Sequence, residues 1–164
     1  MDAGAYDGEM RQVVHSVRAL NSNGEIVNLS AAQCDFGYRH SVFSDGGYLV
    51  LSAEMELQHG DREAIQARMQ ELMTRRKEKQ PLEWPSAGST FKRPQGYFAA
   101  ALIDQCGLKG YSVGGAQVSE KHAGFVINRG GASCSDILKL MDEIRVRVFA
   151  GTGVDLEPEV KYLR

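Results

Sequence analysis

The stretch VVHSVRALNSNGEIVNLS, residues 13–30, decides the fold of the first part of the chain. Apolar and β-branched residues lie on both sides of NSNG, and an Asn-Gly step suits the positive φ values of a hairpin turn. We therefore predict two antiparallel strands joined by this turn. Apolar residues at every second position of 49–57 predict a third strand with one buried face, which pairs with the hairpin.

Helical spacing replaces this alternation after residue 60. Residues 61–79 carry apolar side chains one turn apart, with acids early and Arg or Lys late, as the helix dipole favours. Pro81 ends this predicted helix, and residues 80–96 hold three of the four prolines. This composition is typical of an ordered loop between two units, so we place a boundary there, between domains 1–80 and 81–164.

The second part of the chain mixes short strands with helices. Residues 133–150 predict a helix that begins with a capping box of Ser133 and Asp136 and ends at Gly151. Hairpins alongside separate helices predict an α+β fold rather than a doubly wound parallel sheet. The other expected elements are a short helix in GYFAAALIDQCG (96–107) and strands in YSVGGAQVS (111–119), HAGFVINRG (122–130) and LEPEVKYL (156–163).

Composition and charge exclude several classes of function. The chain has 164 residues and a net charge of -2, which gives no bulk field to attract nucleic acid or an anionic membrane. Three distant cysteines without a CxxC pair argue against a disulfide framework and a structural zinc, and the four histidines lack metal-ligand spacing. Without a leader or a long apolar run, the chain is expected in the cytoplasm, with no membrane span and no metal.

Ser89 lies in SAGSTFKRP, residues 86–94, among small residues and ahead of a Lys-Arg pair. Small neighbours let a ligand approach the backbone, and the hydroxyl can donate a proton. A turn serine that satisfies local backbone groups is the other interpretation, and the residues alone favour it. GxSxG is absent, so nothing supports the nucleophile of a hydrolase.

Charged residues elsewhere allow two interpretations each. Tyr38 and Arg39 lie between Phe36 and Phe43, so the guanidinium either holds a carboxylate or enolate in a bidentate manner or extends over aromatic packing. Glu159 is either an acid or electrostatic partner in a site or an exposed terminal residue. Lys79, in KQP, either meets a diphosphate or complements the dipole of its helix.

The order of the motifs resembles one family. AGAYDGE, FGYRHSVF, KQP, AGSTFKRPQGYFAAALID, GLKGYSVGGAQVSEKHAGFVIN and LEPEVKYL follow one another as in the UDP-N-acetylenolpyruvoylglucosamine reductases of bacterial cell-wall synthesis. The resemblance implies a flavoenzyme that takes hydride from NADPH onto FAD. The resemblance further implies that the flavin passes the hydride to the enolpyruvyl group of UDP-N-acetylglucosamine enolpyruvate, giving UDP-N-acetylmuramate.

The resemblance also implies roles for individual residues. Ser89 matches the proton donor, Arg39 the arginine that stabilises the developing enol carboxylate, and Glu159 the carboxylate that assists there. Hydride addition builds negative charge on the carboxylate, so a fixed cation and a nearby hydroxyl form a coherent set. The residues matched to binding are Tyr38, Lys79, Lys109 and His122 for the substrate, with both lysines at the diphosphate, and Gly4, Ala5 and Tyr6 for the flavin-binding domain.

Departures from the family pattern limit what the chain alone is expected to do. His122 stands where the longer form of the family has glutamine, which indicates the shorter form, and Arg93 replaces the usual asparagine of FKNP. Members carry glycine-rich flavin-binding segments ahead of AGAY, so the chain resembles the end of a flavin domain, 1–80, followed by a substrate domain, 81–164.

This chain is therefore expected to be a fragment that holds FAD poorly and does not turn over NADPH. A non-catalytic UDP-sugar-binding or interaction module remains the alternative. Strand edges left exposed by truncation predict self-association between copies.

Overall fold

The computed structural model describes residues 1–162, and the chain divides into two compact units, Met1–Asp61 and Arg62–Arg164. Each unit has its own cluster of buried apolar side chains. Antiparallel sheets and separate helices confirm the predicted α+β class. The predicted boundary at residue 80 separates a flavin-binding domain from a substrate-binding domain. This division by function stays a prediction.

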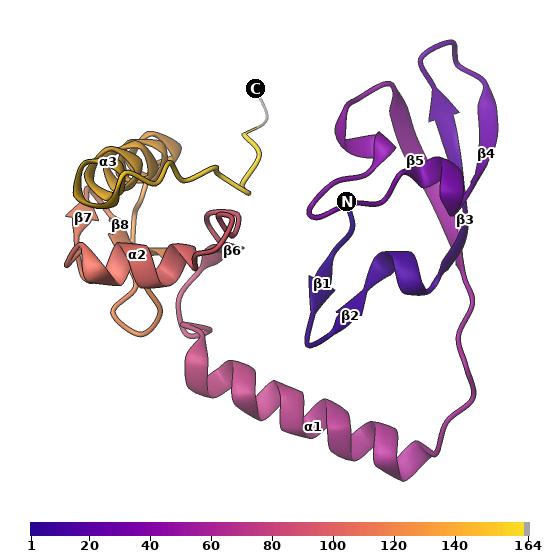
Figure 1. Cartoon of the computed structure of the whole chain (residues 1–164), viewed down its shortest axis with the longest axis horizontal. Coiled ribbons are helices and arrows are strands. Elements are labelled where there is room, and N and C mark those ends of the chain that lie inside the picture. Colours follow the sequence, from indigo (N-terminus) through magenta and orange to yellow (C-terminus); the bar gives the residue numbers. More distant parts are fainter. Residues whose placement is uncertain (163–164) are drawn as a thin grey trace. The chain divides into compact units, whose positions relative to one another are not determined.

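The first unit is built on a three-stranded antiparallel sheet of order β4-β3-β5 (Figure 1). Its core contains Val14, Val17, Ala19, Leu29 and Cys34, and burial raises the pKa of the Cys34 thiol. A separate two-stranded hairpin, β1-β2, precedes the sheet. The bounds are β1 Gly4–Ala5, β2 Gly8–Glu9, β3 Val14–Asn21, β4 Ile26–Ser30 and β5 Tyr48–Met55, with 3-10 turns at Met10–Gln12, Ala32–Cys34 and Val42–Ser44.

The predicted hairpin of residues 13–30 is confirmed, with a different turn. β3 and β4 pair from Ser16 with Ser30 to Leu20 with Ile26. Of the Asn-Gly step only Gly24 has a positive φ, of 80°. Asn21 closes the loop instead, because its Oδ1 accepts the N–H groups of Asn23 and Glu25 at 3.0 and 2.9 Å.

β5 pairs with β3 as predicted, but it lacks the buried face that its alternating pattern predicts. Leu49, Leu51 and Met55 are 62%, 48% and 54% exposed, and Val50 on the other face is 47% exposed. The strand is an edge of its sheet, and its pairing with β3 is interrupted by register shifts. The apolar alternation therefore indicated a strand correctly but did not show what covers it.

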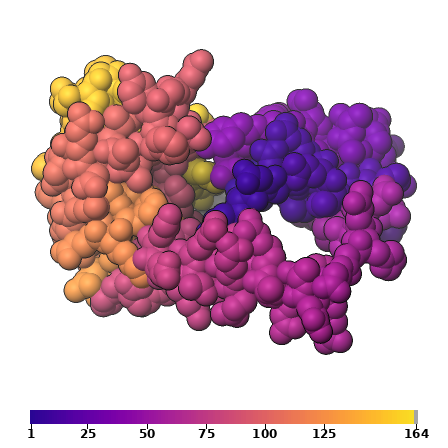
Figure 2. Space-filling model, turned by 60° about the horizontal axis from the view of Figure 1, so that its bottom comes forward, coloured from indigo at the N-terminus to yellow at the C-terminus, as the bar shows by residue number. Residues whose placement is uncertain are grey.

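Helix α1, Arg62–Lys79, confirms the helix predicted for residues 61–79, but none of its residues is buried. Figure 2 shows this segment, in magenta, on the surface. Its ion pairs follow helical spacing: Glu71 pairs with Arg68 at 2.7 Å and with Arg75 at 2.5 Å. Intrahelical pairs of this kind support an exposed helix. Its C-terminal end is held by Lys121, whose Nζ donates to the Lys77 carbonyl at 2.7 Å.

The second unit packs two helices with a four-stranded antiparallel sheet of order β6-β9-β8-β7. Helix α3 packs against β7, β8, β9 and α2, and Figure 1 shows it beside β7 and β8. Its buried stripe contains Leu140, Met141, Ile144 and Val148, each worth about 1.5–3 kcal/mol of burial. The bounds are β6 Ser86–Ser89, α2 Ala99–Gln105, β7 Ser112–Val113, β8 Ala116–Val118, β9 Phe125–Asn128 and α3 Cys134–Thr152.

The predicted capping box of α3 is present. The Ser133 side chain accepts from the Asp136 N–H at 3.1 Å, and the Asp136 carboxylate accepts from the Ser133 N–H at 2.9 Å. Hydrogen bonds from Ser133 hold the pKa of Asp136 below its usual range. The helix ends at Gly153, with φ of 73°, rather than at Gly151.

Three predictions for the second unit need correction. The single strand predicted over 111–119 is a hairpin of β7 and β8, which turns at Gly114, where φ is 56°. The predicted loop 80–96 contains strand β6, because Ser86 and Ser89 pair with Ile127 and Phe125. The predicted last strand, 156–163, is reduced to a single bridge between Phe91 and Pro158, since proline has no N–H to donate to a ladder. Leu163, at its predicted end, lies outside the described residues. In residues 1–162 no helix is long and apolar enough to cross a membrane.

Candidate functional site

Arg39 sits on a strained stretch of the first unit, where its φ is 55°. Non-glycine residues in this region cost free energy and cluster at ligand sites. The guanidinium lies 5.1 Å from the centre of the Tyr38 ring, and Nη2 donates to the Gly4 carbonyl at 3.4 Å. The fold therefore brings together three of the predicted site residues: Gly4, Tyr38 and Arg39.

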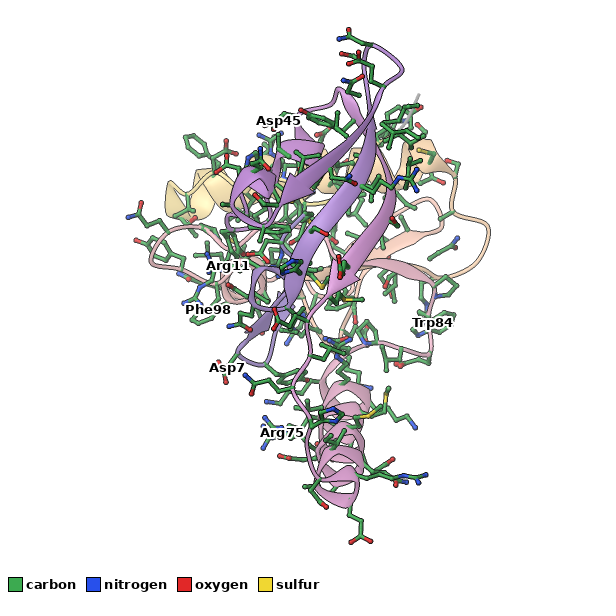
Figure 3. The ribbon with its side chains drawn as sticks, turned by 90° about the vertical axis from the view of Figure 1, so that its right-hand side faces the viewer. Asp7, Arg11, Asp45, Arg75, Trp84 and Phe98 are labelled. Carbon is green, nitrogen blue, oxygen red and sulfur yellow. The ribbon has the colours of Figure 1, made fainter. Side chains whose placement is uncertain are left out.

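The β1-β2 hairpin carries the predicted flavin contacts Gly4, Ala5 and Tyr6. Its tip is strained, since Tyr6 and Asp7 have φ of 51° and 68°, and Figure 3 labels Asp7 there. Tyr6 is 39% exposed and offers an aromatic face. A Cβ on Gly4 would lie 3.0 Å from Cγ of Glu9 in the same hairpin, so this glycine serves strand pairing and forms no cradle for a ligand.

Asp2 anchors this region and was missed by the sequence analysis. The residue is 2% exposed, and its carboxylate accepts from the Arg11 N–H at 3.0 Å and pairs with the Arg11 Nε at 3.4 Å. Its own N–H donates to the His40 carbonyl at 3.1 Å. Asp2 thereby joins the segment of Tyr38 and Arg39 to the hairpin. Nothing in the local pattern distinguishes it from an exposed acid.

Ser89 ends strand β6 and is exposed. Its Oγ donates to the Phe91 carbonyl at 3.4 Å, which is a long and weak hydrogen bond. The next residue, Thr90, is 3% exposed and fixes the strand on both sides. The Thr90 N–H donates to the Gly124 carbonyl at 2.9 Å, and its carbonyl accepts from the Glu159 N–H at 2.9 Å.

These backbone bonds bring Ser89, Glu159 and the turn of His122 together in the second unit. Glu159 is half-buried, whereas Glu157 is exposed and pairs with Lys92 at 2.5 Å. The Lys92 ammonium is thus paired with Glu157. The arrangement presents a hydroxyl and a carboxylate on adjoining segments, which suits proton transfer.

His122 is half-buried in the turn that leads into β9. The centres of the His122 and Phe125 rings lie 4.9 Å apart, in an edge-to-face arrangement. The His122 Nδ1 accepts from the Gly124 N–H at 3.1 Å. Burial lowers the pKa of the imidazole, and the charge of Lys109 lowers that pKa further. A neutral ring with Nδ1 occupied as an acceptor carries its proton on Nε2, which makes that atom a hydrogen-bond donor.

Replacing His122 by glutamine should reduce the acid sensitivity of the second unit. Because the pKa of His122 is lower in the folded chain than its ordinary 6.5, the unfolded state takes up protons first. The contribution of His122 to the stability of the folded chain is therefore fully present above pH 6.5, and it is lost as the pH falls below that value. Urea unfolding followed by Trp84 fluorescence, at several pH values, should give a flatter dependence for H122Q.

The exposed His59, which lies between β5 and α1, supplies the matched control. We expect H59Q to keep the pH dependence of the unmodified chain. Equal dependences for H122Q and the unmodified chain would contradict the assignment of the acid sensitivity to His122.

The two predicted diphosphate lysines differ in their surroundings. Lys109 pairs with Asp104, at the end of α2, at 2.7 Å, and its charge acts on His122. Any anion at Lys109 competes with this exposed carboxylate. Lys79 is exposed in the last turn of α1, where the helix dipole favours a cation. The Lys121 contact with the end of α1 ties this turn to the segment that carries His122.

Arg93, the departure from FKNP, acts on its own loop. Its guanidinium stacks 4.0 Å from the centre of the Phe98 ring, and Nε donates to the Tyr97 carbonyl at 3.3 Å. Phe98, labelled in Figure 3, is 60% exposed. Arg93 and Tyr97 also line an open pocket with Lys92 and Glu157. These contacts favour a role in shaping the loop after Ser89.

The predicted site residues therefore fall into two groups, one in each unit. The first unit holds Gly4, Ala5, Tyr6, Tyr38 and Arg39, and the second unit holds Lys79, Ser89, Lys109, His122 and Glu159.

Within residues 1–162, no group of three His, Cys, Asp or Glu side chains is placed to hold a metal ion.

Comparisons with known proteins agree over most of the chain. A family model described as UDP-N-acetylenolpyruvoylglucosamine reductase, C-terminal domain, matches residues 80–163. Reductases of that name from Clostridium novyi (strain NT) and Clostridioides difficile (strain 630) are 54% and 56% identical. These matches cover 98% and 99% of this chain, and 52% and 54% of those proteins.

A crystal structure of the reductase from Thermus caldophilus has a TM-score of 0.83 and 34% identity to this chain. The match covers 98% of this chain and 57% of that one. The chain spans about half the length of the curated relatives it matches.

Proposed function

Because the chain belongs to the UDP-N-acetylenolpyruvoylglucosamine reductase family, we propose that it supplies the substrate-handling part of such an enzyme. The reaction reduces UDP-N-acetylglucosamine enolpyruvate to UDP-N-acetylmuramate in peptidoglycan synthesis. One observation supports this most strongly: the Thr90 backbone joins the strand of Ser89 directly to Glu159 and to the turn of His122. A hydroxyl, a carboxylate and a hydrogen-bond donor then border one segment. The cytoplasm remains the predicted location.

In this proposal Ser89 delivers the proton that completes the reduction. Hydride addition to one alkene carbon places negative charge on the neighbouring carbon and on the attached carboxylate. A serine hydroxyl is a weak acid in water, but it can protonate so basic a carbon. Arg39 stabilises the carboxylate charge, and Glu159 assists by hydrogen bonding or electrostatics.

Substrate binding is assigned to further residues in each of the two units. Lys79 and Lys109 are proposed to meet the diphosphate, which requires Lys109 to leave Asp104. The Nε2–H of neutral His122 can donate to an acceptor on the nucleotide sugar. Tyr38, 54% exposed beside Arg39, offers an aromatic face.

FAD and NADPH are proposed as cofactors from the family relationship. When bound, the flavin supplies the hydride, which it receives from NADPH. Of the described residues, Tyr6 can contribute an aromatic contact, whereas Gly4 is satisfied within its own hairpin. We therefore propose that this chain alone holds flavin weakly or not at all and does not oxidise NADPH.

The proposal is tested by calorimetric titration of the chain with UDP-N-acetylmuramate after its visible absorbance is recorded. We expect binding without flavin colour, and UDP should compete. A complete reductase, prepared by joining this chain to the part of the Clostridioides difficile relative that it does not match, should consume NADPH only with the enolpyruvyl substrate. Binding by the chain without turnover in the complete protein would favour a non-catalytic UDP-sugar module. Loss of both would refute the proposal.

We further propose that copies of the chain associate through the β5 edge. Sedimentation velocity should show concentration-dependent association, which L51K should reduce, because a lysine on an edge strand opposes strand addition. Val146, 68% exposed on α3 outside any sheet, supplies the control V146K, which should leave association unchanged. Equal association in all three proteins would contradict an interface at β5.

A further inference from the structure

We propose that Thr90 is a positioning residue for Ser89 and Glu159, and that it acts through its side-chain hydroxyl. This inference rests on the proposed function and deepens it. Thr90 does not itself touch the reacting atoms in this proposal. Its hydroxyl fixes the strand segment from which both groups extend.

The first step concerns an irregularity in the pairing of β6 with β9. Ser86 pairs with Ile127 and Ser89 pairs with Phe125, so three residue steps on β6 oppose two on β9. The extra residue forms a bulge near Gly88, whose φ is 87°. A bulge leaves part of the ladder without its regular backbone partner.

The second step is that the Thr90 hydroxyl replaces the missing backbone acceptor. On β9, the Asn128 N–H still bonds to a backbone carbonyl, that of Pro85, at 2.9 Å. The Val126 N–H, two residues earlier, bonds instead to the Thr90 Oγ1 at 3.0 Å, and this contact is buried. Without the hydroxyl, the buried Val126 N–H would lose its hydrogen-bond partner, and a buried donor without an acceptor costs free energy of folding.

The third step connects this hydroxyl to the site. The Thr90 N–H and carbonyl bond to Gly124 and to Glu159, so a shift of Thr90 moves these contacts together. Among residues 1–162, the Ser89 side chain makes only a long hydrogen bond of 3.4 Å, to the Phe91 carbonyl, and it takes its direction mainly from the backbone. The Thr90 hydroxyl therefore controls where Ser89 points relative to Glu159.

Kinetics of the complete reductase test this with three variants. Thr90→Val keeps the shape of the side chain and removes the acceptor, and it should lower kcat by about 10-fold or more with little change in KM. Thr90→Ser keeps the hydroxyl and should restore most of kcat. Thr152→Val makes the same change at a half-buried threonine in α3, whose hydroxyl bonds to the Val148 carbonyl at 2.7 Å, and should leave kcat unchanged.

A solvent isotope effect on kcat separates positioning from general loss of structure. In Thr90→Val the proton transfer from Ser89 should become slower than other steps, so the isotope effect should increase. Wild-type kcat in Thr90→Val, or equal losses in Thr90→Val and Thr152→Val, would overturn the proposal. If Thr90→Val does not fold, Thr90→Cys, whose thiol is a weaker acceptor than a hydroxyl, should have a kcat between those of Thr90→Val and the unmodified enzyme. An unchanged kcat in Thr90→Cys would then contradict the proposal. Inactivity of the unmodified reductase would instead refute the proposed function.

Discussion

Replacing Ser89 by alanine in the complete reductase should lower kcat by about 10²–10⁴-fold, the usual contribution of a positioned general acid. The substitution should change KM little, because in the proposed mechanism the hydroxyl acts only once charge has developed on the substrate carbon. Ser89 is exposed at the end of β6, so its loss should not cost appreciable stability.

Steady-state assays of NADPH oxidation with the enolpyruvyl substrate measure this effect. Ser112 supplies a matched control, since it is an exposed serine on β7 whose Oγ donates to the Gly110 carbonyl at 3.1 Å. We expect S112A to behave as the unmodified enzyme. If the kcat of S89A were within a few-fold of that of S112A, Ser89 would not be the proton donor, and another group would have to supply the proton.

The sequence predicted correctly those helices and strands that are determined by residues close to one another in the chain. The β3-β4 hairpin follows from residues 13–30, and helix α3 follows from its apolar stripe and from Ser133 with Asp136. Burial is a different matter, because it depends on what covers a face. The apolar residues of β5 and α1 have the spacing of buried faces, and yet none of them is buried.

The site was harder to predict, because long-range backbone contacts create it. Nothing near Ser89 shows that a strand begins at Ser86, since the pairing depends on β9, nearly forty residues later. Glu159 was expected on a strand, and the Thr90 carbonyl holds it instead. Asp2 and Thr90 carry no motif of their own, and residues of both types are mostly exposed in proteins, so the sequence does not show that they are buried.

Replacing Gly115 by alanine should destabilise the second unit by about 3 kcal/mol, at the upper end for an added methyl group in a packed interior. An added Cβ would lie 2.5 Å from the Ala132 nitrogen and 2.6 Å from the Gly130 carbonyl oxygen. Both contacts are with backbone, which cannot turn aside as a flexible side chain does. The strain therefore falls on the loop that leads into α3.

That loop has little freedom to move. The Asn128 Oδ1 accepts from the Gly130 N–H at 2.9 Å and from the Ala132 N–H at 3.1 Å, and the Arg129 N–H donates to the Gly115 carbonyl at 2.9 Å. Relief of the clash would break one of these bonds or displace the N-terminal cap of α3. We expect the loss of stability to reach the whole unit for this reason.

Thermal unfolding followed by the fluorescence of Trp84, the only tryptophan and a residue of the second unit (Figure 3), measures the effect. G115A should lower Tm by roughly 10 °C or more. Gly131 controls for backbone conformation alone, because its φ is 70° and a Cβ there meets nothing within 4 Å. G131A should cost only about 1 kcal/mol. If G115A were no more harmful than G131A, the loop would be able to shift, and the close approach of Gly115 to residues 130–132 would not hold the second unit together.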